Sequence, residues 1–228
     1  VTDWFDKKTG TDFVKETKKA LSDLNVCAKK GLSETFDSTI GARSVYMPWG
    51  GRNQLTPAIA MAAKICGGET DVCTVSAYGY SPYLMETSPF VGAIYSIVAS
   101  VSKVVATGAR YEDIRLTLQE FFERMTSDKK VWGVPASALL GAVYAQIGLS
   151  LGAIGGKDSM SGTFENIDVP PTLISFATGV TTDDKIISDV FDCPGKLYLI
   201  DLRRDYHGYP YFDWTLKQLD SVSELIEK

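Results

Sequence analysis

The stretch Ile154–Gly162, IGGKDSMSG, is the part of the chain around which we expect the other elements to be arranged. A helix-like apolar run, Pro135–Leu151, leads directly into it. A proline pair and a β-rich run with almost no charge, Thr172–Val180, follow it. Two glycines, a lysine, an aspartate and two serines therefore lie between two elements that should be buried, and glycines let a backbone turn sharply and come close to a ligand.

The chemistry of this stretch is that of an anion or phosphate site. Lys157 supplies a positive charge, and Ser159 and Ser161 supply hydroxyl donors. The pattern is not that of a P-loop, which requires a longer glycine loop ahead of the lysine. A polar turn that carries two glycines is the alternative interpretation, and the spacing alone leaves both open.

The composition is that of an ordinary globular protein and limits the classes of partner. The chain has 228 residues, of which 45% are hydrophobic and 22% charged, so it can bury a sizeable core. A net charge of −5 argues against a nucleic-acid partner. We expect no membrane partner, because we find no apolar run near the roughly 18 residues of a membrane span. The polar start, Val1–Gly10, is no signal peptide and lacks Met, so we expect an excised fragment of a cytoplasmic protein.

Cysteine and histidine usage excludes several classes of site. Four scattered cysteines (Cys27, Cys66, Cys73 and Cys193) make no disulfide framework, so we expect reduced, buried thiols. The single histidine, His207 in DYHGYP, is expected to be an exposed loop residue rather than a catalytic base. No GxSxG, HExxH or GxGxxG motif occurs, which argues against hydrolase, zinc-protease and dinucleotide-binding functions.

Hydrophobic periodicity predicts an α+β domain with helices on one face of a sheet. Helices are predicted over Thr11–Leu24, Phe90–Thr107, Tyr111–Thr126, Pro135–Leu151 and from Asp213 or Thr215 to Ile226. Strands are predicted over Phe36–Val45, Asp71–Tyr80, Thr172–Val180 and Leu197–Leu202. Between them we predict a loop at Met47–Thr56 and either a short helix or an irregular crossing at Pro57–Ile65.

Other polar residues leave a functional and a structural reading open. Asp71 opens a predicted strand, where its carboxylate is suited to a Mg²⁺ ion or simply to the surface. The loop Gly50–Arg52 has anion-binding potential, although a solvated turn is the favoured interpretation. Asp37 and Arg43 either pair with each other or contact a ligand.

Seven segments, in order along nearly the whole chain, resemble the phosphoribosylformylglycinamidine synthase family. They are FDSTIG at 36–41, MPWGG at 47–51, QLTPA at 54–58, TD at 70–71, SPFVGA at 88–93, DIRLTLQEFF at 113–122 and GGKDSMSGTFENIDVPPTL at 155–173. The last segment, in which GGKDSMS precedes a Pro-Thr-Leu strand, is the most specific. Enzymes of this family are large amidotransferases of purine biosynthesis.

The resemblance implies a domain arrangement. The family has two tandem AIR-synthase-like copies, and this chain is similar to the N-terminal subdomain of the second. It implies a tail after the first copy at 1–35, an AIR-synthase-like N-terminal domain at 36–183 and an incomplete C-terminal-like domain at 184–228. The expected fold is a mixed, mainly antiparallel sheet with helices packed on one face.

The resemblance also implies an activity that belongs to a larger enzyme. The family is a carbon–nitrogen ligase, which uses ATP, Mg²⁺ and glutamine to convert formylglycinamide ribonucleotide to the amidine. Its catalytic histidine and main ATP site lie in the first copy, and its glutamine chemistry lies in a glutaminase domain. The expected partners are therefore those two units and the ribonucleotide, with no catalytic residue in this chain. The isolated fragment is expected to be inactive.

Two sites carry over from the family to residues of this sequence. The substrate-cleft residues would be Gly155, Gly156, Lys157, Asp158, Ser159 and Ser161. A second, degenerate nucleotide site would use Asp71 as metal ligand, with Ala99 and Lys103 in place of the family's Glu and Asn ligands. Lys103 would replace the metal's charge or pair with Asp71, so we expect Mg-ADP to bind weakly or not at all.

Two other readings of the same family remain. The first is a purely structural or dimerising AIR-synthase-like module without ligand binding, in which Lys157, Asp158 and Ser159 would not matter. Separately, an exposed apolar sheet face that normally pairs with a partner copy would favour a homodimer of the isolated fragment. The second is a stand-alone thiamine-phosphate or selenophosphate enzyme, which the incomplete C-terminal subdomain and the missing metal-binding pair disfavour.

Overall fold

A computed structural model describes residues 12–35, 39, 41–66, 69–190 and 194–226. The predictions for Asp37 and Cys193, and most of the FDSTIG segment, lie outside these residues. Of the predicted strand at Phe36–Val45, the structure describes the last part, which forms β1.

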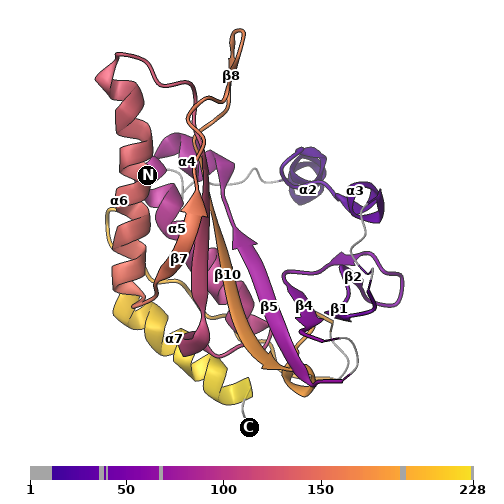
Figure 1. Ribbon diagram of the computed structural model, residues 1–228. Coiled ribbons are helices and arrows are strands. Elements are labelled where there is room, and N and C mark those ends of the chain that lie inside the picture. The colour runs from indigo at the N-terminus through magenta and orange to yellow at the C-terminus, as the bar shows by residue number, and fades with distance from the viewer. Residues whose placement is uncertain (1–11, 36–38, 40, 67–68, 191–193, 227–228) are drawn as a thin grey trace.

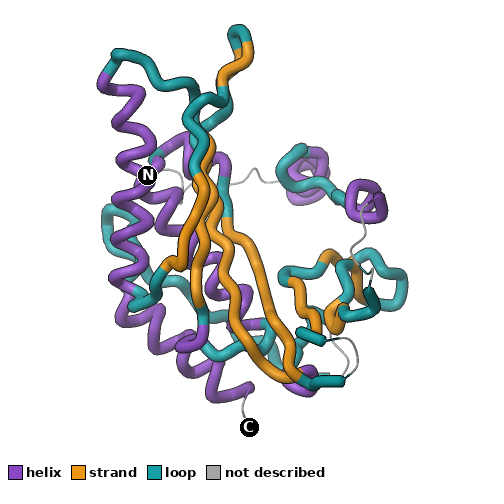
Figure 2. Tube along the Cα trace, in the orientation of Figure 1, coloured by secondary structure: helices purple, strands orange, loops and turns teal. Residues whose placement is uncertain are grey.

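A six-stranded sheet forms the centre of the molecule (Figures 1 and 2). Its spatial order is β1 (Ser44–Tyr46), β4 (Met61–Lys64), β5 (Val72–Gly79), β10 (Thr172–Thr182), β6 (Arg115–Phe121) and β7 (Ala153–Lys157). Every neighbouring pair is antiparallel except β6 and β7, which are parallel. The predicted mixed, mainly antiparallel sheet is confirmed.

The long helices lie together on one side of this sheet, as Figure 1 shows. They are α5 (Pro89–Ala106), α6 (Lys129–Gly148) and α7 (Phe212–Ile226), preceded by the short α4 (Pro82–Thr87). On the other side stand the N-terminal helices α2 (Phe13–Ser22) and α3 (Lys30–Thr35). The remaining elements are β2 (Trp49–Gly50), β3 (Thr56–Pro57), β8 (Thr163–Phe164), β9 (Ile167–Asp168) and the 3₁₀ turns η1 (Tyr111–Asp113) and η2 (Asp183–Lys185).

The core lies between α5 and the central strands β5 and β10. Side chains alternate along a strand, so every second residue of β5 and β10 is buried under the helices, as at Val75 and Ala177. Burial of α5 on most sides follows from its composition, since Lys103 is its one charged residue. Ser88 accepts a hydrogen bond from the Val91 amide at 3.4 Å and Pro89 follows it, so the predicted helix start is confirmed.

Glycine sets how closely α5 approaches its neighbours. A Cβ on Gly79 of β5 would lie 1.9 Å from the Ser96 carbonyl oxygen of α5. A Cβ on Gly141 of α6 would lie 2.1 Å from the Phe90 carbonyl oxygen. A Cβ atom could not lie this close to another atom, so these two glycines let α5 contact the backbones of β5 and α6 directly. The small residues of Pro135–Leu151 predict close packing on a sheet, but the helix that contains them, α6, packs on α5 instead.

The predicted helix over Tyr111–Thr126 is wrong, because this segment forms η1 and then the strand β6. Its apolar residues fit a helical stripe, but Leu116 and Leu118 also alternate with Arg115, Thr117 and Gln119 at the period of a strand. Pairing of the whole length of β6 with Thr172–Thr178 of β10 stabilises the strand. Tertiary pairing overrides the local pattern here.

Two further segments differ from prediction. Pro57–Ile65 is neither a helix nor an irregular crossing, because Met61–Lys64 pairs with β5 as strand β4. Leu197–Leu202 is not a strand, although it is an apolar run that Asp201 alone interrupts. No described strand lies beside it, and Leu199 is 93% exposed. An isolated β-bridge joins Arg204 and Pro210 just beyond it.

Two helices are long and apolar enough to cross a membrane, so the expectation that no such run exists is wrong. They are α5 and α6, with 61% and 28% of their apolar windows buried in this fold. For α5 the apolar composition is explained by packing against the sheet. Much of the apolar surface of α6 faces outward.

Candidate functional site

The glycines of the Ile154–Gly162 stretch lie in a strand rather than in a loop. Residues Ala153–Lys157 form β7, which pairs in parallel with β6 and has every residue exposed. Gly155 has open space where a Cβ would point, whereas a Cβ on Gly156 would lie 2.6 Å from the Leu118 carbonyl oxygen. Neither glycine has a positive φ angle. The expected sharp turn is therefore wrong, and the close approach at Gly156 is to the protein's own strand.

Backbone hydrogen bonds continue the contact beyond β7. The Ser159 amide donates to the Glu120 carbonyl at 3.0 Å, and the Phe122 amide donates to the Ser159 carbonyl at 2.8 Å. The Gly162 amide then donates to the Phe122 carbonyl at 2.9 Å. The segment 158–162 is thus held along residues 120–122 by its main chain, which leaves its side chains available.

The side chains of this segment gather at one edge of the sheet. Lys157 is exposed, and its Nζ lies 4.4 Å from the centre of the Phe121 ring, a cation–π contact that orients the ammonium group. Asp158 and Ser161 are exposed and Ser159 is half-buried. The structure therefore brings all six predicted substrate residues together, because they are consecutive along one edge.

Glu120 is a residue of this site that the sequence reasoning missed. Its side chain is 4% exposed, and its Oε1 has no hydrogen-bond partner. Burial and then the nearby Asp158 raise the pKa of this carboxyl to about 7. Glu120 pairs with Leu173 of β10 and faces the helices. The sequence could have indicated this buried position only if Arg115–Phe121 had been recognised as a strand.

The cavity beside this segment does not suit an anion. It has a volume of about 330 Å³ and is lined partly by Phe122, Val169 and three acidic residues, Glu86, Glu123 and Asp168. Carboxylates repel a phosphate group. An anion at this edge would therefore be held by Lys157 on the open side.

Asp71 and Lys103 do not form one site. Asp71 is exposed at the start of β5, and its carbonyl accepts a hydrogen bond from the Asp183 amide at 2.8 Å. Lys103 donates from Nζ to the Tyr78 carbonyl at 2.9 Å, seven residues further along the strand. Burial lowers the pKa of Lys103. Lys103 thus hydrogen-bonds a carbonyl in the part of β5 that does not pair with β4. The expected pairing of Lys103 with Asp71 is wrong.

The residues around Asp71 do not fit a Mg-nucleotide site. No group of three potential metal ligands occurs among the described residues. The nearby cation Lys64 forms an ion pair with Asp183 at 2.5 Å. This pairing raises the pKa of the ammonium and lowers that of the carboxyl. Ala99 offers no ligand atom.

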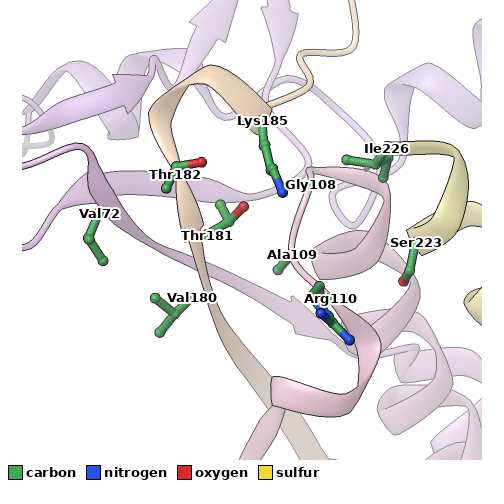
Figure 3. A pocket seen from close by; sticks show the side chains of 10 residues that line it. All are labelled: Val72, Gly108, Ala109, Arg110, Val180, Thr181, Thr182, Lys185, Ser223 and Ile226. Atoms are coloured by element: carbon green, nitrogen blue, oxygen red, sulfur yellow. The ribbon is translucent and has the colours of Figure 1, made fainter. Parts of the chain in front are cut away.

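A cavity of about 220 Å³ lies at the same end of the sheet (Figure 3). Lys185 from η2 and Arg110 before η1 contribute cations to its wall, and Ser223 contributes a hydroxyl from α7. Arg110 forms an ion pair with Glu112, and the Ser223 hydroxyl accepts from the Tyr111 amide at 3.4 Å. Arg110 and Ser223 are thus engaged in holding the turn and α7 in place, and the sequence did not indicate the cavity.

The remaining candidates have structural surroundings. Gly51 has a φ of +77°, as a turn requires, and Arg52 is exposed. Arg43 donates to the Ile65 carbonyl at 3.2 Å. His207 is exposed, as predicted. Cys27, Cys66 and Cys73 are free thiols, but only Cys73 among them is buried, so the prediction of buried thiols is wrong for the other two.

The fold has counterparts among solved structures. No protein-family model and no curated protein matches the chain. PurL from Thermotoga maritima complexed with FGAR matches 86% of this chain and 29% of its own, with TM-score 0.59 and 17% identity. PurL complexed with ADP matches 73% and 26%, with TM-score 0.56 and 19% identity. The PurLQS structure matches 69% and 24%, with TM-score 0.57 and 17% identity.

This likeness establishes the fold. PurL is a phosphoribosylformylglycinamidine (FGAM) synthase, so the α+β, AIR-synthase-like fold expected from the sequence is confirmed. The chain spans about a quarter of the length of the structures it matches.

Proposed function

We propose that this chain is a module of a phosphoribosylformylglycinamidine synthase, in which Gly155–Ser161 lines the substrate cleft. The observation that carries the proposal is the placement of the GGKDSMS segment. It lies on the free edge of a sheet whose fold is shared with a PurL structure that holds FGAR. The enzyme class is accordingly an ATP-dependent ligase of purine biosynthesis.

The chemistry of the edge favours a phosphorylated ribonucleotide. The Lys157 ammonium, oriented by Phe121, is a point charge suited to a phosphate group. Ser161 is exposed beside it and adds a hydroxyl donor. Asp158 is a hydrogen-bond acceptor, which suits ribose hydroxyls rather than phosphate. One segment thus offers partners for both ends of a nucleotide.

The complete reaction requires more than this chain. The proposal assigns ATP and Mg²⁺ binding, ammonia supply from glutamine and the catalytic histidine to a second AIR-synthase-like copy and a glutaminase domain. Under this proposal the chain forms one wall of the substrate cleft of a cytoplasmic enzyme and is inactive when isolated. Its domain limits are 1–35, 36–183 and 184–228. Weak or absent Mg-ADP binding at Asp71 and Lys103 belongs to the same proposal.

Binding of FGAR to the chain tests the proposal without requiring turnover. In calorimetric titration, Lys157→Ala is expected to weaken FGAR binding at least about tenfold, since it removes a charge-assisted contact. Lys129→Ala is the matched control, because Lys129 is an exposed lysine at the start of α6. In the synthase that contains this module, the same change should raise KM for FGAR. Equal affinity of the Lys157 and Lys129 variants would contradict the substrate-cleft role.

A structural or dimerising module is the second candidate, and the surface of α6 favours it. Leu140 and Ile147 of α6 are 64% and 73% exposed, and Ile154 of β7 is 79% exposed. An exposed apolar surface of this kind is typical of an interface. Under this alternative, Leu140→Lys with Ile147→Lys would convert an oligomer to a monomer in analytical ultracentrifugation, while Lys157→Ala would change nothing.

A further inference from the structure

Glu120 lies directly beneath the segment that carries the candidate site. Its backbone carbonyl accepts a hydrogen bond from the Ser159 amide at 3.0 Å. Its side chain points to the side of β6 that the helices cover. There Oε1 is buried without a partner. A buried carboxylate with an unpaired oxygen is far more costly than a neutral carboxylic acid in the same place. The fold therefore favours the protonated side chain.

Few charges face this carboxyl. From the neighbouring edge, Asp158 is the charge that acts on it. On β10 its cross-strand neighbour is Leu173. In α5 the single charged residue, Lys103, donates to the Tyr78 carbonyl of β5, which lies on the other side of β10. The charges of α6, Lys129 and Lys130, are exposed in its first turn.

The adjoining chain adds charges of both signs. Glu123 and Arg124 follow β6, and Glu86 lies in α4 near the same cavity. Glu123 and Glu86 have the same sign as Asp158, and the Arg124 side chain is exposed to water. No described cation makes an ion pair with Glu120. Ionisation of Glu120 would therefore place a second negative charge near Asp158 without compensation.

We propose that Glu120 is a positioning residue whose proton holds the segment 158–162 against β6, so that loss of this proton releases the segment. Release moves Asp158 away from the carboxylate and opens the edge of β6 beside it to water, so both costs fall. The backbone bonds at Ser159 and Gly162 are the contacts that break. The consequence for substrate rests on the proposed function, whereas the release itself does not.

The size of the effect follows from the two environments. Burial places the pKa of Glu120 at about 7 in the docked state, against 4.5 for an ordinary glutamate. Proton linkage then predicts that the ratio of released to docked molecules rises about tenfold between pH 6 and pH 8. Most of this rise occurs between pH 6 and pH 7, and the ratio levels off above the pKa of the docked carboxyl.

Amide hydrogen exchange of the substrate-free chain tests the proposal. Protection factors, corrected for intrinsic exchange rates, should fall about tenfold from pH 6 to pH 8 at Ser159 and Gly162. Protection at Val75 in the central strand should stay far higher at both pH values, because it reports global unfolding rather than release of the segment. Glu120→Gln, which mimics the protonated acid, should abolish the fall. Glu123→Gln, the matched control on a half-exposed glutamate, should retain it.

The outcomes separate this proposal from the proposed function. An equal fall in wild type and Glu120→Gln, or no fall in wild type, would overturn the role of Glu120. If Glu120→Gln does not fold, Asp158→Asn takes its place and should reduce the fall, because it removes the neighbouring charge. FGAR affinity is measured separately. A proton-dependent segment that binds no FGAR would uphold the positioning role and reject the substrate cleft.

Discussion

Lys103 and Lys157 were both expected at binding sites, and they lie in opposite surroundings. Lys103 is half-buried and donates to a strand carbonyl, so its charge is used within the fold. Lys157 is exposed over the Phe121 ring, at an edge where no described strand follows β7. The comparison separates a lysine that closes a strand edge from one that remains available to a ligand. Four measurements test this distinction.

The largest effect is expected from a glycine pair, one member beside each lysine. Gly79→Ala should lower the free energy of unfolding by about 4 kcal/mol, because its Cβ would overlap backbone atoms of α5. Gly155→Ala is the matched control with open space around its Cβ, and it should change stability by less than about 0.5 kcal/mol. Urea denaturation measures both. Similar losses would mean that the two regions are equally packed.

Stability should fall as pH rises through neutrality because of Glu120. Its folded pKa is about 7 and its ordinary value is 4.5, so the stabilisation is complete below pH 4.5 and is lost as pH rises through about 7. The loss amounts to about 3 kcal/mol. Urea denaturation of wild type and Glu120→Gln at acid and alkaline pH should show this difference only in wild type. Parallel pH profiles would show that other groups govern the dependence.

Replacing the lysines themselves gives a smaller effect. Lys103→Met keeps the apolar stem but leaves the Tyr78 carbonyl without its donor, which should cost about 1 to 2 kcal/mol. Lys157→Met should cost less than about 0.5 kcal/mol, since an exposed cation–π contact contributes little. Thermal unfolding of both variants provides the measurement. A larger loss at Lys157 would reverse the assignment of structural and available lysine.

The smallest effect is expected from Mg-ADP. The Lys103 side chain is committed to Tyr78, Ala99 offers no ligand atom and Asp71 lies at the other end of β5. Addition of millimolar Mg-ADP should therefore raise Tm by less than about 1 °C, since stabilisation by a ligand requires a concentration well above Kd. Stoichiometric ADP and Mg²⁺ in the purified protein would refute this prediction.

The sequence predicts best those elements whose determinants all lie within one continuous segment. The buried helix α5 has its cap, proline and apolar run in consecutive residues. The six candidate substrate residues lie together because they all fall within Gly155–Ser161, while their role in binding stays a prediction. Motif resemblance gave the fold at an identity to solved structures of 17% to 19%.

The parts that sequence missed depend on partners distant in the chain. Tyr111–Phe122 supports helical and strand periods alike, and β10 decides between them through pairing some 60 residues away. The buried, unpaired carboxyl of Glu120 is a consequence of strand β6, so it could not be predicted while this segment was taken for a helix. The converse holds at Leu197–Leu202, where a strand-like pattern finds no described strand to pair with.

The parallel contact between β6 and β7 has a consequence for folding kinetics. Leu118 pairs with Gly156 only after the chain has travelled through α6, whereas antiparallel neighbours can be joined by a tight turn. Contacts between distant residues form slowly, because the loop must close before the contact stabilises it. The candidate cleft segment should therefore acquire protection during refolding later than the pair β4 and β5, whose partners are much closer along the chain, and earlier than the pair β5 and β10, whose partners are the most distant.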